Sequence, residues 1–270
     1  MIKNWLITGD THGKILERIS HIDEKQYPPK ETALIILGDA GFNFYLNKTD
    51  WKLKRNTNNT GYTIYCVRGN HEERPENLKI PLIYDEEVNG LVYCEKEFPN
   101  IKYFVDGGSY DIKGYSVLTI GGAYSVDKWH RIGDKNSKTT WTGWFKDEQL
   151  TYNERQKITR QVENQSYDFV LTHTCPYTWR PTDLFLSFVD TTTVDPTMEL
   201  WLEELKNKIN YDIWLFGHFH ADRIERSKSE IFYKNIEEID DIYNRWNVED
   251  GLIKKLSYLE NPKYYNKEEV

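Results

Sequence analysis

Short apolar runs recur along this chain, and a tight polar turn follows each of them. They occupy residues 5–8, 33–37, 63–67, 169–172 and 213–216. Runs of four or five aliphatic, β-branched or aromatic residues without alternation are typical of strands that are covered on both faces. The pattern therefore predicts a buried sheet with polar residues at the ends of its strands.

Segments with helical signals separate several of these runs. The clearest begins with Asp195 as N-cap and Pro196 at the first helical position, and it places apolar residues on one face over 198–209. Residues 47–56 and 146–165 are also expected to be helical. Strands that alternate with helices favour a layered α/β fold.

Three further runs break this alternation, at 91–95, 101–105 and 115–120, and the turns between them predict a second sheet. We therefore expect the α/β class, as a four-layer α/β/β/α sandwich that forms one domain over residues 1–270. The acidic, tyrosine-rich tail after about residue 235 carries no clear structural signal.

Residue types that bind metal ions or move protons stand directly after the five buried runs. They are Asp10 and His12, Asp39, Asn70 and His71, His173, and His218 and His220. One such pair alone is weak evidence, because a Gly-Asp after a strand is usually a turn. Five of the seven histidines nevertheless fall at these strand ends. Because ligands of open α/β sheets bind outside the carboxyl ends of the strands, we expect these side chains to meet at one edge of one sheet.

The motifs GDTHG, LGDAG, RGNHE, LTHT and FGHFH occur in this order between positions 9 and 220. In this order they closely resemble the pattern of the calcineurin-like metallophosphoesterase superfamily, with every expected element present. The resemblance implies a sandwich of the metallophosphoesterase type and two metal ions that share Asp39. It assigns Asp10, His12, Asp39 and His220 to one ion, and Asp39, Asn70, His173 and His218 to the other.

The chemistry of this family explains why it needs these ligands. Two divalent ions about 3.5–4 Å apart share a carboxylate and a hydroxide, and the hydroxide attacks phosphorus in line with the leaving group. Histidine, carboxylate and amide oxygen suit manganese, which we expect first, or iron, zinc or nickel, better than calcium. Two such ions outweigh the charges of Asp10 and Asp39, so the site of an acidic protein can still attract phosphate.

His71 follows the expected ligand Asn70, and the resemblance implies that it is the general acid for the leaving alkoxide. The alternative is a histidine that only orients a ligand. Glu72 is interpreted as a capping or structural carboxylate. The phosphoprotein phosphatase branch carries an aspartate where this chain has Phe42, although RGNHE matches that branch. The partner that orients His71 is therefore unidentified.

Residues 122–145 form a polar segment that is cationic and rich in tryptophan within an acidic chain. One interpretation is a substrate loop in which Lys128 or Arg131 binds phosphate and Trp129 or Trp141 stacks on an organic group. The alternative is a solvated loop whose tryptophans pack beneath it. Specificity often resides in loops above a rigid scaffold.

Two further arginines stand near the motifs. Arg74 follows GNHEE and Arg180 follows His173, so both are candidates for phosphate contact, although either could equally be a surface residue.

The composition limits the partners and the compartment. The net charge of −8 and pI of about 5.5 argue against extended nucleic-acid binding. The three scattered cysteines, without a C-x-x-C pair, indicate neither a disulfide framework nor a thiolate zinc site and fit a reducing cytoplasm. The start of the chain shows no signal-peptide pattern and no run of 18 apolar residues occurs, so we expect neither export nor membrane insertion.

The sequence thus predicts a two-metal phosphoesterase that acts on a phosphate monoester or diester. A nuclease-like phosphodiesterase and a phosphoprotein phosphatase-like enzyme are the alternatives within the class. A non-catalytic interaction domain on the same fold is the alternative outside it, but no expected ligand is missing. The substrate, the native metals and the oligomeric state stay open.

Overall fold

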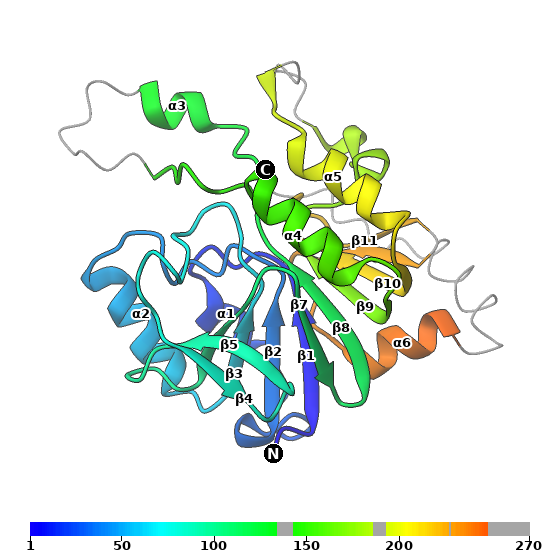
Figure 1. Ribbon diagram of the computed structural model, residues 1–270. Helices are drawn as coiled ribbons and strands as arrows, with labels where there is room; N and C mark the ends of the chain where they lie inside the picture. The colour runs from blue at the N-terminus through cyan, green and yellow to red at the C-terminus, as the bar shows by residue number, and fades with distance from the viewer. Residues whose placement is uncertain (134–142, 186–192, 227, 248–270) are drawn as a thin grey trace.

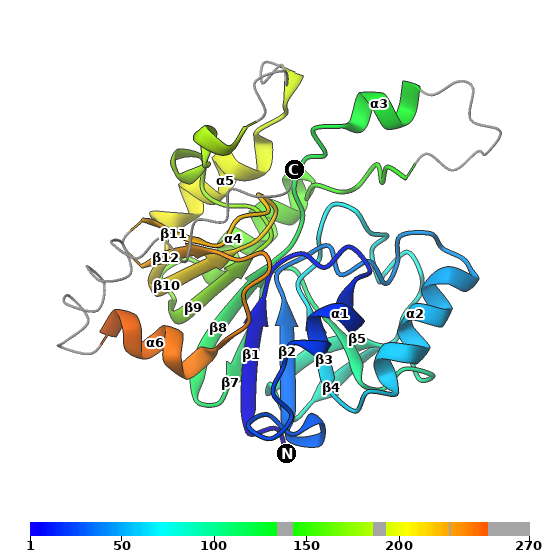
Figure 2. The same ribbon diagram turned by 180° about the vertical axis from the view of Figure 1, so that it is seen from behind.

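The computed structural model describes residues 1–133, 143–185, 193–226 and 228–247 (Figures 1 and 2). Within them, a seven-stranded sheet has the order β13-β1-β2-β3-β6-β5-β4, and its three central pairings, β1 with β2, β2 with β3 and β3 with β6, are parallel. Its strands are β1 (Asn4–Thr8), β2 (Thr32–Ile36), β3 (Thr63–Cys66), β4 (Leu82–Asp85), β5 (Gly90–Cys94), β6 (Ile101–Phe104) and β13 (Glu237–Glu238).

A second sheet of six strands among the described residues has the order β11-β12-β10-β9-β8-β7. Its inner strands β12, β10, β9 and β8 pair in parallel, and both edge strands are antiparallel to their neighbours. The strands are β7 (Gly108–Ile112), β8 (Tyr115–Ile120), β9 (Ser166–Thr172), β10 (Asn210–Phe216), β11 (Arg223–Arg226) and β12 (Ser229–Ile231).

Helices cover the outer faces of both sheets (Figure 1). The α-helices are α1 (Ile15–Ser20), α2 (Lys48–Asn58), α3 (Lys128–Gly133), α4 (Tyr152–Val162), α5 (Thr197–Lys206) and α6 (Ile239–Asn247), and the short 3₁₀ turns are η1 (Pro29–Glu31), η2 (Tyr177–Trp179) and η3 (Thr182–Leu184). α1 and α2 flank the first sheet and α4 and α5 the second, whereas α3 projects away from the sheets.

Three buried apolar clusters explain why the strands are continuous apolar runs in the sequence. Along β2, Ile35 faces a cluster between the two sheets, whereas Leu34 and Ile36 face Ile15 and Ile19 of α1. A third cluster joins the outer face of the second sheet to α4 and α5. Both faces of the central strands are covered, so no polar alternation is required. This arrangement confirms the predicted α/β/β/α sandwich.

The sequence-based division of strands between the sheets was wrong. The runs at 91–95 and 101–105 became β5 and β6, which extend the first sheet, and only the run at 115–120, as β8, joins the second. The runs at 169–172 and 213–216 also belong to the second sheet, as parts of β9 and β10. Apolar runs report burial on two faces, but they do not identify the neighbouring strand.

The three predicted helices are present with shifted ends. α4 begins after a capping box in which Thr151 and Glu154 exchange side-chain and backbone hydrogen bonds. α5 begins at Thr197, one residue later than expected, and Asp195 Oδ1 accepts the Thr197 N–H at 3.0 Å. The aspartate therefore still satisfies a free N–H of the first turn. The tail after 235 contributes β13 and α6 before the described residues end at 247.

Candidate metal centre

The loops that follow β1, β2 and β3 meet the loops that follow β9 and β10 at one end of the sandwich. Asp10, His12 and Asp39 come from the first sheet, and His173 and His218 come from the second. The prediction of one edge of one sheet was therefore wrong, because the residues converge across the interface between two sheets. Parallel strands in both sheets end at the same side, which brings their loops together.

Four of the converging residues have a left-handed backbone. The φ angles are 44° at His12, 50° at Asp39, 67° at His218 and 51° at His220. Each such conformation costs a non-glycine residue about 1–3 kcal/mol and persists only where the surrounding fold enforces it. The strained backbone at these four residues therefore directs their side chains but does not stabilise the fold.

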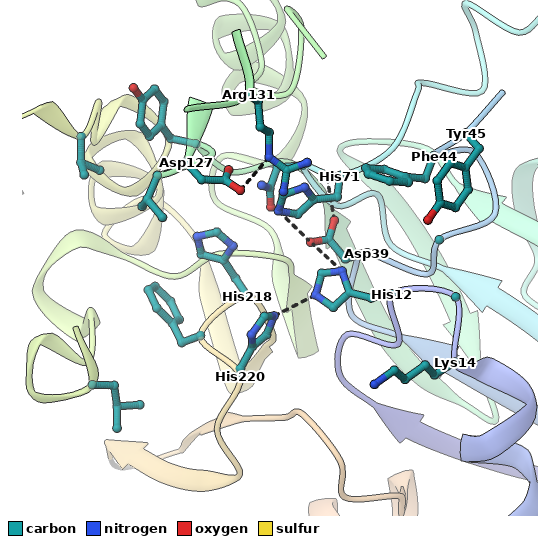
Figure 3. Close-up of a pocket in the computed structure, with 18 of the residues that line it drawn as sticks. His12, Lys14, Asp39, Phe44, Tyr45, His71, Asp127, Arg131, His218 and His220 are labelled. Carbon is teal, nitrogen blue, oxygen red and sulfur yellow. Dashed lines mark hydrogen bonds and ion pairs between the residues drawn. The ribbon is translucent and has the colours of Figure 1, made fainter. Parts of the chain in front are cut away.

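A first group of possible metal ligands consists of Asp10, His12 and His220. The two imidazoles face each other with 2.8 Å between their Nε2 atoms (Figure 3). Asp10 Oδ2 lies 3.3 Å from His220 Nε2 and 3.7 Å from His12 Nε2. Asp10 Oδ1 accepts the His218 N–H at 2.9 Å, but the buried Oδ2 has no hydrogen-bond partner. Two imidazole nitrogens thus lie close to a buried carboxylate oxygen that has no hydrogen-bond partner, an arrangement that fits a bound cation.

A second group consists of Asp10, Asp39 and His173, all buried. Asp39 Oδ2 lies 3.6 Å from His173 Nε2 and 4.0 Å from His12 Nδ1. Its other oxygen, Oδ1, accepts the His71 N–H at 2.8 Å. Asp10 belongs to both groups, and Asp39 of the second group lies close to His12 of the first, so the two groups adjoin each other.

Charge compensation shapes the pKa values of these groups. Burial lowers the pKa of His173, but the carboxylates of Asp39 and Asp10 outweigh it and raise the pKa to about 9. Burial alone would raise the pKa of Asp39, yet His173, His71 and His12 hold it well below its ordinary value. Burial, assisted by the charge of His173, lowers the pKa of His218 to about 3. Two buried carboxylates thus need a positive charge beside them. Divalent metal ions can provide it, and so can a protonated histidine.

Asn70 is held by a chain of buried polar side chains. Its Oδ1 lies 2.8 Å from His173 Nε2, and its Nδ2 donates to Ser125 Oγ at 2.8 Å. Ser125 Oγ in turn donates to Glu148 Oε2 at 2.5 Å. The chain directs the amide oxygen of Asn70 toward the centre, as partners of metal ligands commonly do. Sequence reasoning missed Ser125 and Glu148, because neither lies in a motif.

His71 lies on the same side of the centre as Arg131 (Figure 3). Its Nε2 lies 4.0 Å from Asp39 Oδ2. Burial lowers the pKa of His71; Asp39 opposes this change and Arg131 adds to it. Among the described residues, no hydrogen bond holds the imidazole. Phe42, at the position where the related branch has an aspartate, is fully buried in the core beside α1.

Glu72 is buried next to the centre. Its Oε1 accepts the Gly69 N–H at 2.5 Å, and burial together with the charge of Asp39 raises its pKa to about 7. This contact gives Glu72 a structural role in the turn that carries Asn70 and His71.

Gly38 provides a test of how tightly the centre is packed. Its φ is +99°, and a Cβ built there would lie 2.0 Å from His173 Nδ1. That nitrogen contacts the Leu37 carbonyl at 2.8 Å, so the imidazole has little freedom to move. We expect Gly38→Ala to displace His173, to reduce bound metal and to lower the free energy of unfolding by more than the roughly 1–3 kcal/mol of backbone strain alone. Chemical denaturation and elemental analysis measure both effects.

Gly114 offers a matched control for this variant. Its φ is +87°, but a Cβ there would meet nothing within 4 Å. Gly114→Ala should therefore show the backbone strain alone and leave metal binding intact. Equal effects of the two substitutions would mean that the contact with His173 is unimportant.

A cavity of about 830 Å³ opens above the centre. Its wall includes His12, Asp39, Asn70, His71, His218 and His220 from the converging loops. Phe44 and Tyr45 line one side (Figure 3), and Leu184, Phe185 and Phe219 contribute further apolar surface. Ligand sites of 300–1,000 Å³ with apolar walls and a few polar groups are typical of small-molecule binding.

Of the four predicted substrate residues, the structure brings only Arg131 and Arg180 to this cavity. Arg131 Nε donates to Asp127 Oδ2 at 2.7 Å, which fixes its direction. Arg74 and Lys128 do not line it. Arg74 donates to the carbonyls of Asp147 and Gln149 and pairs with Glu154.

Lys128 packs against aromatic side chains. The Lys128 ammonium lies over the rings of Trp144, Trp129 and Tyr124, at 4.5, 5.2 and 5.5 Å from their centroids. Trp129 is 62% exposed. The loop prediction also named Trp141, which lies outside the described residues.

Fold and site together define a metal-dependent phosphoric ester hydrolase, in which carboxylates and histidines from two sheets face one cavity. Residues 4–222 match the profile of the calcineurin-like phosphoesterases, and the chain belongs to this family. The family typically binds two metal ions.

Among solved structures, the chain is similar to a phosphopantetheinyl hydrolase from Mycobacterium tuberculosis. The TM-score is 0.40 and the sequence identity 11%, over 85% of this chain and 88% of that chain. A comparison with curated proteins found no match. None of the helices in the described part of the chain has the length and apolar character needed to cross a membrane.

Proposed function

We propose that this enzyme hydrolyses a phosphate monoester or diester at a centre of two divalent metal ions, with His71 as general acid. The observation that carries the proposal is the pair of adjoining ligand groups at the cavity: both contain Asp10, and Asp39 of the second group, which lines the cavity, lies 4.0 Å from His12 of the first and 3.6 Å from His173. When bound, the ions supply a hydroxide for attack on phosphorus and stabilise charge on its oxygens.

The geometry supports the assignment of ligands implied by the sequence. Asp10, His12, Asp39 and His220 would hold one ion, and Asp39, Asn70, His173 and His218 the other. Asn70 is aimed by Ser125 and Glu148, and His218 lies beside His173, with ring centroids 5.0 Å apart. Manganese is the ion we propose first, because the donor set combines imidazole nitrogen with carboxylate and amide oxygen.

The remaining polar residues of the wall would bind and protonate the substrate. Arg131, which is held by Asp127 and lines the cavity near His71, would contact phosphate oxygens. His71 would donate its proton to the leaving oxygen. Arg180 would contact the part of the substrate farther along the cavity.

The alternatives within the class have less support. A nuclease-like enzyme needs basic surface for a phosphate backbone, but the chain is acidic overall. A phosphoprotein phosphatase-like enzyme would orient His71 with a second aspartate, and Phe42 is buried at that position.

A turnover screen tests the proposal. Protein loaded with manganese should hydrolyse p-nitrophenyl phosphate, bis-p-nitrophenyl phosphate, a nucleotide or a phosphopeptide, and the preferred ester distinguishes monoesterase from diesterase. Failure on every ester, with metal bound, would contradict the proposed activity.

Metal content provides an independent test. Elemental analysis after manganese loading and desalting should give two ions per chain, because two ligand groups adjoin each other, sharing Asp10 and lying 4.0 Å apart at Asp39 Oδ2 and His12 Nδ1. Removal by a chelator should abolish turnover, and added manganese should restore it. A stoichiometry of zero would remove the basis of the proposal, and a stoichiometry of one would mean that only one group is a site.

A further inference from the structure

The side of the cavity nearest the second sheet holds a buried carboxyl group that none of the steps above uses. Glu199 lies in the first turn of α5, is only 5% exposed and lines the cavity. Thr174 Oγ1 donates to its Oε1 at 2.8 Å, whereas the buried Oε2 has no hydrogen-bond partner. An unpaired buried oxygen costs free energy, and a donor on a bound ligand would offset that cost.

Arg180 lies near this carboxyl group without neutralising it. Burial raises the pKa of Glu199, while its own backbone N–H, the hydrogen bond from Thr174 and the charge of Arg180 oppose the rise. Among the described residues Arg180 forms no ion pair, and its guanidinium lies 3.8 Å from the centroid of the Tyr177 ring. A cation and a carboxyl group thus share one part of the cavity, and both retain hydrogen-bonding capacity for a ligand.

The cavity that Glu199 lines also has apolar and aromatic side chains in its wall. Leu184, Phe185, Val194 and Phe219 line the same cavity. The rings of Phe185 and Phe219 are nearly parallel, at 17°, with centroids 6.3 Å apart. Aromatic faces beside a few fixed polar groups suit a flat organic ring, because stacking supplies affinity and the hydrogen bond supplies selectivity.

We propose that Glu199, Arg180, Phe185 and Phe219, here called the Glu199 corner, bind the organic group of the substrate. That group would be a flat ring system with an N–H or O–H donor for Glu199 Oε2. The inference rests on the proposed phosphoesterase activity, which places the phosphate at the metal centre. The cavity of about 830 Å³ leaves room for such a group beside the phosphate.

Matched nucleotides test the Glu199 corner. One pair is adenosine and 6-methylpurine riboside 5′-monophosphate, and the other is 2-aminopurine riboside and purine riboside 5′-monophosphate. Within each pair the leaving group is unchanged and only the amine donor differs. We expect the wild type to favour the amine-bearing member of at least one pair by about 10- to 100-fold in kcat/KM.

Glu199→Gln should abolish this preference. The glutamine Oε1 can still accept from Thr174, but its Nε2 donates where the carboxyl oxygen accepts. Glu204→Gln is the matched control, because Glu204 is exposed on the same helix and does not line the cavity. The control variant should retain the wild-type preference.

Binding of the four free nucleosides to metal-free protein gives a readout without turnover. Calorimetry should show tighter binding of the same amine-bearing member, and Glu199→Gln should remove the difference. Equal kcat/KM within both pairs, an unchanged preference in Glu199→Gln, or binding of none of the nucleosides would overturn the Glu199 corner. Absence of turnover with every ester would instead contradict the phosphoesterase proposal. Nucleoside binding would then be the test of the Glu199 corner.

Discussion

Asp39→Asn is expected to reduce turnover by more than about 10³-fold, because several kcal/mol of charge stabilisation depend on both ions being held. The substitution keeps the shape of the side chain and the acceptor for the His71 N–H, but it removes a negative charge that lies close to a histidine of each ligand group, His12 and His173. Asparagine also tolerates the left-handed backbone at this position, where φ is 50°. The effect should therefore appear in metal content and rate rather than in folding.

Asp23→Asn serves as a matched control, because Asp23 is an exposed carboxylate whose Oδ1 accepts the Lys25 N–H. Rates and metal stoichiometry of the two variants should be compared at the same manganese concentration, together with thermal unfolding. Normal turnover of Asp39→Asn with two ions still bound would show that the carboxylate does not join the two sites.

His71→Asn is expected to lower the rate by about 10²–10⁴-fold for esters with basic leaving groups, while metal content stays near normal. The reason is that His71 contacts the centre through its backbone N–H and lies in neither candidate ligand group. An alkyl phosphate needs a proton on its leaving oxygen, whereas p-nitrophenolate departs readily without one. The loss should therefore grow with the pKa of the leaving group.

A series of esters with graded leaving groups measures this dependence in single turnovers. The variant should show the steeper slope, and His21→Asn, at an exposed position in contact with the Glu17 carbonyl, should match the wild type. Parallel slopes with a uniform loss would assign His71 to phosphate binding or positioning. Loss of bound metal would assign it to the support of a ligand.

The chemistry of the site was predictable because it depends on local order along the chain. Each buried strand is followed at once by its polar turn, so Asp10, Asp39 and His173 could be recognised from their neighbours. The positions of the proposed substrate residues depend instead on distant partners. Arg74 donates hydrogen bonds to groups that lie 73 to 80 residues away in the sequence, and no local pattern distinguishes it from Arg131.

The sequence by itself determined the buried strands, the helices and the residue types of the centre, since apolar runs and motifs are local properties. Only the tertiary structure decided that these residues come from two sheets and that Ser125 and Glu148 aim Asn70. It also decided that Glu199 lines the cavity and that its buried Oε2 has no hydrogen-bond partner. Strand neighbours and buried polar partners are set by packing between segments far apart in the chain, and burial on two faces looks the same in either sheet.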